Sequence, residues 1–368
     1  MFGSILISLV TVMNLYVFWR AASVPLLKRN VPGHVLAGSG VVLWLVFFAG
    51  RMFGHGTSGA VAGMLELAGM TWMVVLFLAT VSLLMAEAVT GFGLLMPRKA
   101  PTLRGLALLL GGALSVIALV QGLRPPEVHN YDVYLSNLPR EMEGKVLVAM
   151  SDLHVGSRLG KSWLESRVAQ VREQKPDLVV LLGDLFEGHG LDREELLPVL
   201  RSMTAPLGVW AVAGNHEFHG GGNKSLALIR DAGVHLLFNR WAEVRPGFIL
   251  AGVEDLTYNR RAGRNNDPVS KALADRPPGA AILLSHTPLE YEKAAKSGVG
   301  LMLSGHTHGG QIWPFGLVAR LKYPLLEGSY EVAGMTVIVC RGTGTWGLRM
   351  RLWRPGEILR ITLHRKTD

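Results

Sequence analysis

The chain has 368 residues, of which 49% are hydrophobic and only 18% are charged. So few charges are unusual for a soluble protein of this length. The formal net charge is +9, but the first 124 residues hold eight Lys or Arg and two acids, a net +6 that lies beside apolar segments. Basic loops next to membrane spans explain this excess, so we expect no nucleic acid partner. Cys340 is the only cysteine, which excludes an intrachain disulfide, a thiolate zinc cluster and a CxxC redox site, and its apolar surroundings predict a buried core thiol.

Four apolar stretches before residue 124 are long enough, or nearly so, to cross a bilayer as helices. They are residues 2–19, 35–53, 67–90 and 106–123. The loops after the first and third stretches carry three Lys or Arg each, whereas only Arg51 lies at the end of the second stretch and only Arg124 at the exit from the fourth. The positive-inside rule then puts both termini outside the cytoplasm. We therefore predict a transmembrane domain over residues 1–124 of an integral, multi-pass inner or plasma membrane protein, with its C-terminal domain on the extracytoplasmic side.

Residues 125–144 contain three prolines and are predicted to be a connector, followed by a second domain over residues 145–368. In that domain, short continuous apolar runs alternate with helical stretches, a pattern typical of α/β folds whose sheets are covered on both faces. The predicted helix is 162–174, and the predicted strands are 146–150, 178–182, 209–213, 248–253, 281–284, 301–303, 336–339 and 358–363.

Five of these strands end in residues that bind metals or transfer protons. They are Asp152, His154, Asp184, Asn215, His216, His286, His306 and His308. Ligands of open sheets bind outside the carboxyl ends of the strands, so we expect these groups to meet at one point. Two residues apart on an extended segment, Asp152 and His154 would point the same way, as would His306 and His308. The glycines before Asp184, Asn215 and His306 suit sharp turns. Carboxylate, amide and imidazole groups without sulfur suit Mn, Fe or Zn.

The motifs in this order resemble a known signature. Asp152-x-His154, Gly183-Asp184, Gly214-Asn215-His216-Glu217, His286 and Gly305-His306-Thr307-His308 are similar to the signature of the calcineurin-like metallophosphoesterase superfamily. Within that superfamily, the chain resembles the branch of transmembrane proteins with a metallophosphoesterase domain. The resemblance implies a four-layer αββα sandwich, here preceded by an all-α four-helix transmembrane domain.

The resemblance also implies two divalent metal ions and assigns their ligands. Asp152, His154 and His308 would hold one metal. Asn215, His286 and His306 would hold the second, and Asp184 would bridge both. His216 would act as an acid, or as an electrostatic clamp, near the leaving oxygen. Two metals about 3.5–4 Å apart would activate a bridging hydroxide for in-line attack on phosphorus, without a covalent enzyme intermediate.

Two stretches are candidates for substrate selection. Residues 312–326 are apolar and include Trp313 and Phe315, and residues 346–354 mix apolar and basic side chains. They are either a core flap with an edge strand or a basic, apolar surface that presents a phospholipid-like substrate. Arg341 and Arg349 are candidate phosphate contacts, and residues 258–267 are a predicted surface loop with three arginines.

The predicted function is a membrane-anchored metal-dependent phosphoesterase that hydrolyses phosphodiester or pyrophosphate bonds of a phosphorylated, lipid-linked substrate. Membrane lipids are the expected partners, and no obligate protein partner is identifiable. One alternative is a UDP-2,3-diacylglucosamine-type pyrophosphatase of lipid A synthesis, which requires a cytoplasmic catalytic domain. Another is a membrane sensor or transporter with a metal-binding, non-catalytic domain. Glu66 and Glu87, inside or at the edge of the third span, are candidates for a relay, although no matching basic residue lies mid-span.

Overall fold

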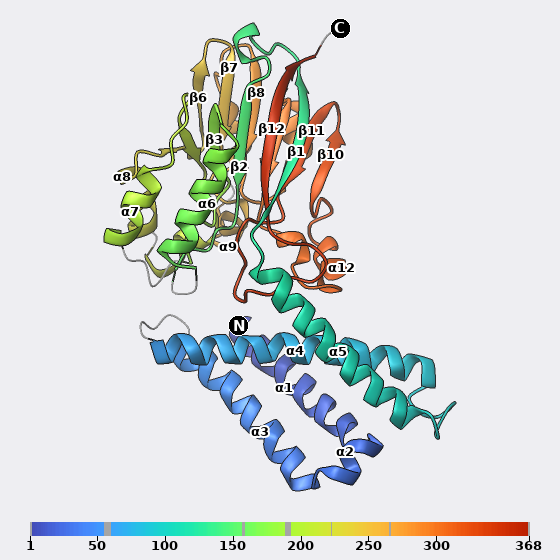
Figure 1. The fold of residues 1–368 in the computed structure, drawn as a ribbon. Coiled ribbons are helices and arrows are strands. Elements are labelled where there is room, and N and C mark those ends of the chain that lie inside the picture. Colours follow the sequence, from blue (N-terminus) through green and yellow to red (C-terminus); the bar gives the residue numbers. More distant parts are fainter. Residues whose placement is uncertain are drawn as a thin grey trace. The chain divides into compact units, whose positions relative to one another are not determined.

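The computed structural model describes residues 2–54, 60–156, 159–187, 193–221, 223–264 and 266–366. The chain divides into two compact units (Figure 1), one of Met1–Leu123 with Gly347–Leu352 and one of Arg124–Trp346 with Trp353–Asp368. The predicted boundary at residue 124 differs from this division by one residue. Gly347–Leu352, however, groups with the first unit, because the Arg351 amide donates to the Ala118 carbonyl of helix α5 (Ala100–Leu123) at 2.9 Å. Contacts of this kind cannot be read from sequence order.

Within the described residues of the first unit, four helices are long and apolar enough to cross a membrane, by length and composition. The candidate spans are Gly3–Ala21, Gly33–Phe53, Val61–Thr90 and Ala100–Leu123. They lie in α1 (Phe2–Ala21), α3 (Gly33–Ala49) with the π-helical turn η1 (Gly50–Gly54), α4 (Ala60–Thr90) and α5, and a short α2 (Pro25–Asn30) follows α1. The third and fourth spans begin at residues 61 and 100 rather than at 67 and 106. Both extensions take a charged side chain into the helix, Glu66 in α4 and Arg104 in α5.

Glu87 of α4 is fully buried and is paired with two arginines. Its Oε1 atom lies 2.7 Å from Arg104 Nε and 2.9 Å from Arg20 Nε, and Arg104 also donates to Ser23 Oγ at 3.2 Å. Sequence inspection, which found no matching basic residue mid-span, did not predict these partners of Glu87. The partners come from α5 and from the end of α1, which only the packing of the helices brings together. An acid neutralised in this way is typical of ionisable groups in membrane helices.

The second unit is built on two mixed six-stranded sheets. The first has the order β1-β12-β2-β3-β4-β5, and β2 to β5 run parallel. Its strands are β1 (Glu127–Leu135), β2 (Val146–Met150), β3 (Leu178–Leu181), β4 (Val209–Ala211), β5 (His235–Leu236) and β12 (Glu357–Arg365). The second has the order β10-β11-β9-β8-β7-β6, with β7, β8, β9 and β11 parallel. Its strands are β6 (Arg240–Arg245), β7 (Phe248–Gly252), β8 (Ala280–Leu284), β9 (Leu301–Ser304), β10 (Gly328–Val332) and β11 (Met335–Val339).

Four strands were not predicted, and all four lie at sheet edges: β1, β5, β6 and β10. The connector expected over residues 125–144 is corrected accordingly, because it contains β1, which pairs in parallel with β12 along its whole length. Edge strands such as β1, β6 and β10 have exposed polar residues between buried or half-buried ones. Continuous apolar runs mark only strands that are buried on both faces, which are the central ones.

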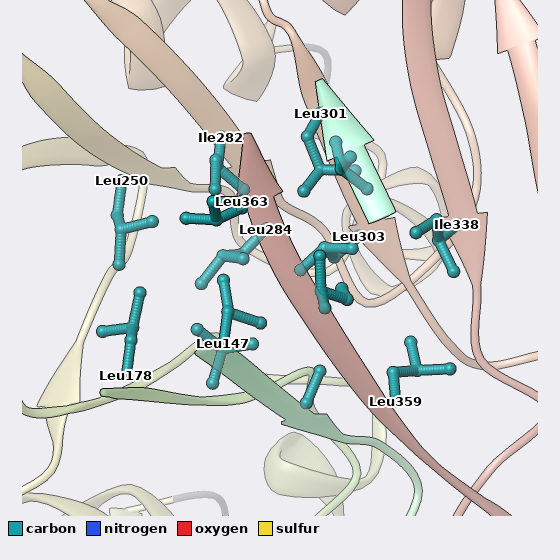
Figure 2. Close-up of a cluster of buried hydrophobic side chains, with 14 of the residues drawn as sticks. Leu147, Leu178, Leu250, Ile282, Leu284, Leu301, Leu303, Ile338, Leu359 and Leu363 are labelled. Carbon is teal, nitrogen blue, oxygen red and sulfur yellow. The ribbon is translucent and has the colours of Figure 1, made fainter. Parts of the chain in front are cut away.

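Leucine and isoleucine side chains from both sheets meet in one buried cluster between them (Figure 2). Leu147, Leu178 and Leu359 come from the first sheet and Leu250, Ile282 and Leu301 from the second. The outer face of the first sheet is covered by α6 (Lys161–Glu173), α7 (Arg193–Arg201) and α8 (Asn223–Asp231). The second is covered by α10 (Pro268–Leu273) and α11 (Tyr291–Lys296). The predicted four-layer αββα sandwich is confirmed, and α6 agrees with the predicted helix within one residue at each end.

Candidate metal centre

The candidate ligands stand at the carboxyl ends of five central strands. Asp152 and His154 follow β2, Asp184 follows β3, and Asn215 and His216 follow β4 of the first sheet. On the second sheet, His286 follows β8, and His306 and His308 follow β9. Because parallel strands end at the same edge of each sheet, loops that are far apart in sequence converge there.

Ligand atoms of these residues form three overlapping groups, in each of which all atoms lie within 4.8 Å of one another. The groups are Asp152 with His154 and His308, Asp184 with His286 and His306, and His154 with Asp184 and His216. The structure therefore brings together every histidine and aspartate predicted for the site.

The first two groups have short internal distances, and the Asp184 carboxylate of one lies near the other. The Nε2 atoms of His154 and His308 are 3.2 Å apart, and His308 Nε2 lies 3.3 Å from Asp152 Oδ1. In the other group, His286 Nε2 lies 3.1 Å from Asp184 Oδ2. Asp184 Oδ2 is also 3.9 Å from His154 Nε2, so this carboxylate lies between the two groups.

Two buried acceptors fit a bound cation. Among the described residues, the Oδ1 atoms of Asn215 and Asp152 are buried and have no hydrogen-bond donor. Leaving such acceptors unsatisfied in the interior costs free energy, about 1–3 kcal/mol for a neutral group and more for a charged one. A divalent cation would satisfy both, because carboxylate and amide oxygens are ligands of such ions.

The ionisation of the groups also suits metal binding. Burial lowers the pKa of His154 and of His306 to about 4, so both imidazoles are neutral at pH 7 and can offer a lone pair. Burial by itself would raise the pKa of Asp152, but the charge of His308, whose Nε2 lies 3.3 Å from Asp152 Oδ1, holds it well below its usual value. The pKa of Asp184 is likewise lowered against the effect of burial, chiefly by the charge and hydrogen bond of His286. Both carboxylates are therefore ionised.

His216 lies beside this centre as a cation. Its backbone amide donates to Asp184 Oδ1 at 2.8 Å, and its Nδ1 atom is 3.3 Å from Glu187 Oε2. Burial works against charging the ring, but the hydrogen bond with Glu187 and the charge of Asp184 raise the pKa of His216 to about 9. The side chain is thus protonated at neutral pH. Glu187 also lies 3.5 Å from His154 Nδ1, so one carboxylate contacts both imidazoles.

In the two paired motifs the backbone of the ligand residues is left-handed rather than extended, which corrects our premise for them. Asp152, His154, His306 and His308 have φ between 48° and 70°, a region that residues other than glycine rarely adopt. These side chains therefore meet through tight turns and not through the alternation of a strand. Such local strain is typical of functional sites and is maintained by the surrounding structure.

The three glycines of the motifs have different roles. Gly183 has a φ of 86°, as expected for a sharp turn. Gly214 and Gly305 are required instead for close approach: a Cβ on Gly214 would collide with the Asp184 carboxylate, and one on Gly305 with Ser151 and Asp152. Substitution at either position would displace a candidate ligand directly.

Comparison with known proteins agrees with the geometry. Residues 145–310 match the calcineurin-like phosphoesterase family. An uncharacterized metallophosphoesterase of Aquifex aeolicus is 34% identical over 242 residues, and the match covers 65% of this chain and 92% of that protein. The chain belongs to the calcineurin-like metallophosphoesterase family.

Another relative of this metallophosphoesterase is the transmembrane protein with metallophosphoesterase domain of Danio rerio. It is 35% identical over 271 residues, which cover 70% of this chain and 62% of that protein. The chain therefore spans less than two thirds of this relative's length. A crystal structure of a dimetal phosphatase from Danio rerio aligns with a TM-score of 0.39 and 16% identity, over 60% of this chain and 99% of that one.

Besides Glu187, two further residues of the metallophosphoesterase domain contact the centre, although neither was predicted to belong to it. The Glu217 carboxylate accepts backbone N–H groups from both the Asp184 and the Asn215 loops. Its place in the Gly-Asn-His-Glu motif was a signal, although no role followed from it. The Tyr323 hydroxyl lies 2.9 Å from His306 Nε2. Nothing in the sequence marks Tyr323, because it belongs to the apolar stretch after the last motif.

The apolar stretch 312–326 is partly buried and partly exposed. Ile312, Tyr323 and Leu326 are buried, whereas Trp313 and Phe315 are 40% and 51% exposed. Phe315 begins helix α12 (Phe315–Arg320), which also exposes further apolar side chains. They are Leu317, Val318 and, just after the helix, Leu321. The second stretch, 346–354, forms no strand, although Trp346 and Trp353 are exposed.

The arginines named for phosphate contact have the following surroundings. Arg341 Nε donates to the Pro355 carbonyl at 3.0 Å, and the guanidinium is 3.5 Å from Glu357. Arg349 belongs to the first unit. A phosphate contact from either residue stays a prediction.

The surface loop predicted over residues 258–267 is corrected in part, because its first residues belong to helix α9 (Leu256–Arg261), which the Asp255 side chain caps.

Proposed function

We propose that the chain is a membrane-anchored, metal-dependent phosphoesterase that hydrolyses phosphodiester or pyrophosphate bonds. The observation that carries this proposal is the pair of neighbouring His/Asp groups at the sheet edge, with the Asp184 carboxylate between them. Two such groups side by side are the arrangement that binuclear phosphoesterases use. The orphaned Asn215 and Asp152 oxygens add independent support.

The residues divide into two sets of ligands. Asp152, His154 and His308 would hold one divalent ion, and Asn215, His286 and His306 the other. Asp184 would contribute to both. Mn, Fe or Zn ions suit this mixture of oxygen and imidazole ligands. When bound, such ions polarise the phosphoryl oxygens and lower the pKa of a coordinated water.

His216 completes the chemistry that the chain itself supplies. As a cation held by Glu187, it offsets negative charge on the departing oxygen and carries a proton that it can donate. Its backbone amide orients Asp184, so the position of the cation and that of the shared carboxylate are linked.

A substrate with an apolar, lipid-like part fits the surroundings of this centre. Only Arg124–Pro126 separate α5 from β1 along the chain, so the tether between the candidate spans and the domain is short. Exposed apolar side chains on α12 lie beside Arg320 and Lys322, a mixture that favours contact with anionic headgroups. The loop charges favour an extracytoplasmic domain, and a reporter fused to the C-terminus would test this.

The reaction is tested with bis-p-nitrophenyl phosphate, using the purified full-length protein with Mn²⁺ or Zn²⁺. We expect turnover by the wild type and a loss of at least about 100-fold in the Asp184→Asn variant, because the shared ligand is removed. The Glu141→Gln variant, changed at an exposed site, is the control and should equal the wild type. No turnover by the metal-loaded wild type, or equal turnover by Asp184→Asn, would contradict the proposal and favour a non-catalytic metal-binding domain.

The lipid-linked substrate is tested separately. We expect the Trp313→Ser/Phe315→Ser double variant to lose activity on phosphodiesters in lipid micelles while it keeps activity on the soluble diester. Tyr134→Ser, which removes an exposed aromatic residue from β1, is the matched control. Equal losses on both substrates would show that the segment around Trp313 and Phe315 does not select a lipid.

A further inference from the structure

The two ring nitrogens of His306 have different neighbours. Its Nδ1 atom is 3.2 Å from His286 Nε2 and so faces the group around Asp184. Its Nε2 atom is 2.9 Å from the Tyr323 hydroxyl. The rings of His306 and Tyr323 meet edge to face, with centroids 5.1 Å apart and an interplanar angle of 78°. Nδ1 is thus directed at the candidate metal centre, and Nε2 contacts the Tyr323 hydroxyl on the other side of the ring.

Tyr323 is itself fixed by the polypeptide around it. Its side chain is 8% exposed, and its backbone amide donates to the Ala319 carbonyl in α12 at 2.9 Å. Helix α12 in turn packs against the turn that follows His308: a Cβ on Gly310 would collide with the backbone of Gly316. The phenol oxygen therefore reaches His306 from a well-packed segment.

This geometry has a chemical consequence for His306. A neutral imidazole binds a metal through the nitrogen that carries no proton, and the hydrogen bond made by the other nitrogen decides which one that is. A phenol oxygen that accepts the Nε2–H of His306 places the proton there and leaves the lone pair on Nδ1. Partners of this kind are worth about 10–100-fold in metal affinity at other sites.

We propose that Tyr323 is a positioning residue for the second metal: its hydroxyl fixes the ring of His306 so that Nδ1 offers its lone pair to the ion shared with Asp184, Asn215 and His286. The proposal rests on the function proposed above, since it assumes that these residues hold a metal. It adds a residue outside the five motifs, contributed by the apolar segment that also exposes Leu317 and Leu321 to the surface.

The Tyr323→Phe variant tests this, because it removes one oxygen atom and keeps the ring in place. Tyr330→Phe is the matched control: the Tyr330 hydroxyl accepts the amides of Leu326 and Glu327, so that variant also loses a tyrosine hydroxyl from this region. The full-length proteins in detergent are titrated with Mn²⁺ by calorimetry, and bound metal is counted after dialysis. Turnover of the soluble diester is measured across Mn²⁺ concentrations.

We expect the wild type to bind two Mn²⁺ ions, and Tyr330→Phe to bind both with the same affinities as the wild type. Tyr323→Phe should bind one ion normally and the other about 10–100-fold more weakly. Its turnover should fall at low Mn²⁺ and recover at high Mn²⁺, a rescue that a general loss of structure would not show. Unchanged affinities in Tyr323→Phe, or equal losses in both tyrosine variants, would overturn the proposal and leave the proposed function intact. A wild type that binds no Mn²⁺ would overturn both.

Discussion

The Glu217→Gln variant probes how the ligand loops are held in place. The Glu217 carboxylate is fully buried and accepts four backbone N–H groups. One oxygen accepts from Asp184 and Gly214 at 2.8 and 2.7 Å, and the other from Leu185 and Phe186 at 2.8 and 3.1 Å. Glutamine has nearly the same shape, but its NH₂ group would face two of these donors. Two buried N–H groups then lose their acceptor, at about 1–3 kcal/mol each, so we expect a loss of about 2–6 kcal/mol.

The measurement is thermal unfolding of the full-length protein in detergent, with metal content determined on the same samples. For a domain of this size, 1 kcal/mol shifts the melting temperature by about 2–4 °C, so a loss near the middle of the range lowers it by about 8–16 °C. Bound metal should fall as well, because the carboxylate joins the loops that carry Asp184 and Asn215. The exposed Glu141→Gln change should shift melting by less than about 2 °C. A Glu217→Gln protein that melts with the wild type and keeps its metal would refute this reasoning.

Three further results follow from the structure. Removal of metal with EDTA should lower the melting temperature and abolish turnover, and Mn²⁺ should restore both, because an ion that binds only the folded state stabilises it; a melting curve unchanged by EDTA would argue against a bound metal. The Glu87→Gln variant should unfold more easily by about 3–5 kcal/mol, since Arg104 and Arg20 would keep buried charges without their counter-ion; melting equal to that of the exposed control above would show that the pair is dispensable. Burial by itself would raise the pKa of Asp177, but hydrogen bonds from the Val146 amide and Lys145 lower it below its usual value. Its stabilising contribution is therefore present above the unfolded pKa, about 3.9, and is lost as the pH falls through the lower folded value. Asp177→Asn should melt below the wild type at pH 7 and approach it near pH 3, and a constant gap would contradict this assignment.

The strands that could be predicted from the sequence are those whose residues are buried on both faces of the sheet. Central strands such as β2, β3 and β8 are buried on both faces, so their residues are continuously apolar and mark themselves in the sequence. Edge strands have one partner and partly exposed faces, so β1 and β6 read as polar segments. Only pairing with β12 and β7 makes them strands.

The same division holds for the site. The sequence by itself determined which residue types stand after which strands, because the carboxyl ends of parallel strands must meet at one edge. From that rule follow the candidate ligands Asp152, Asp184 and His306. Only the tertiary structure decided how they are held. The ligand residues are held in left-handed turns, which the surrounding structure maintains. Glu187 contacts His154 and His216, and the Tyr323 hydroxyl contacts His306. These contacts join segments that are separated along the chain, so they leave no local pattern in the sequence.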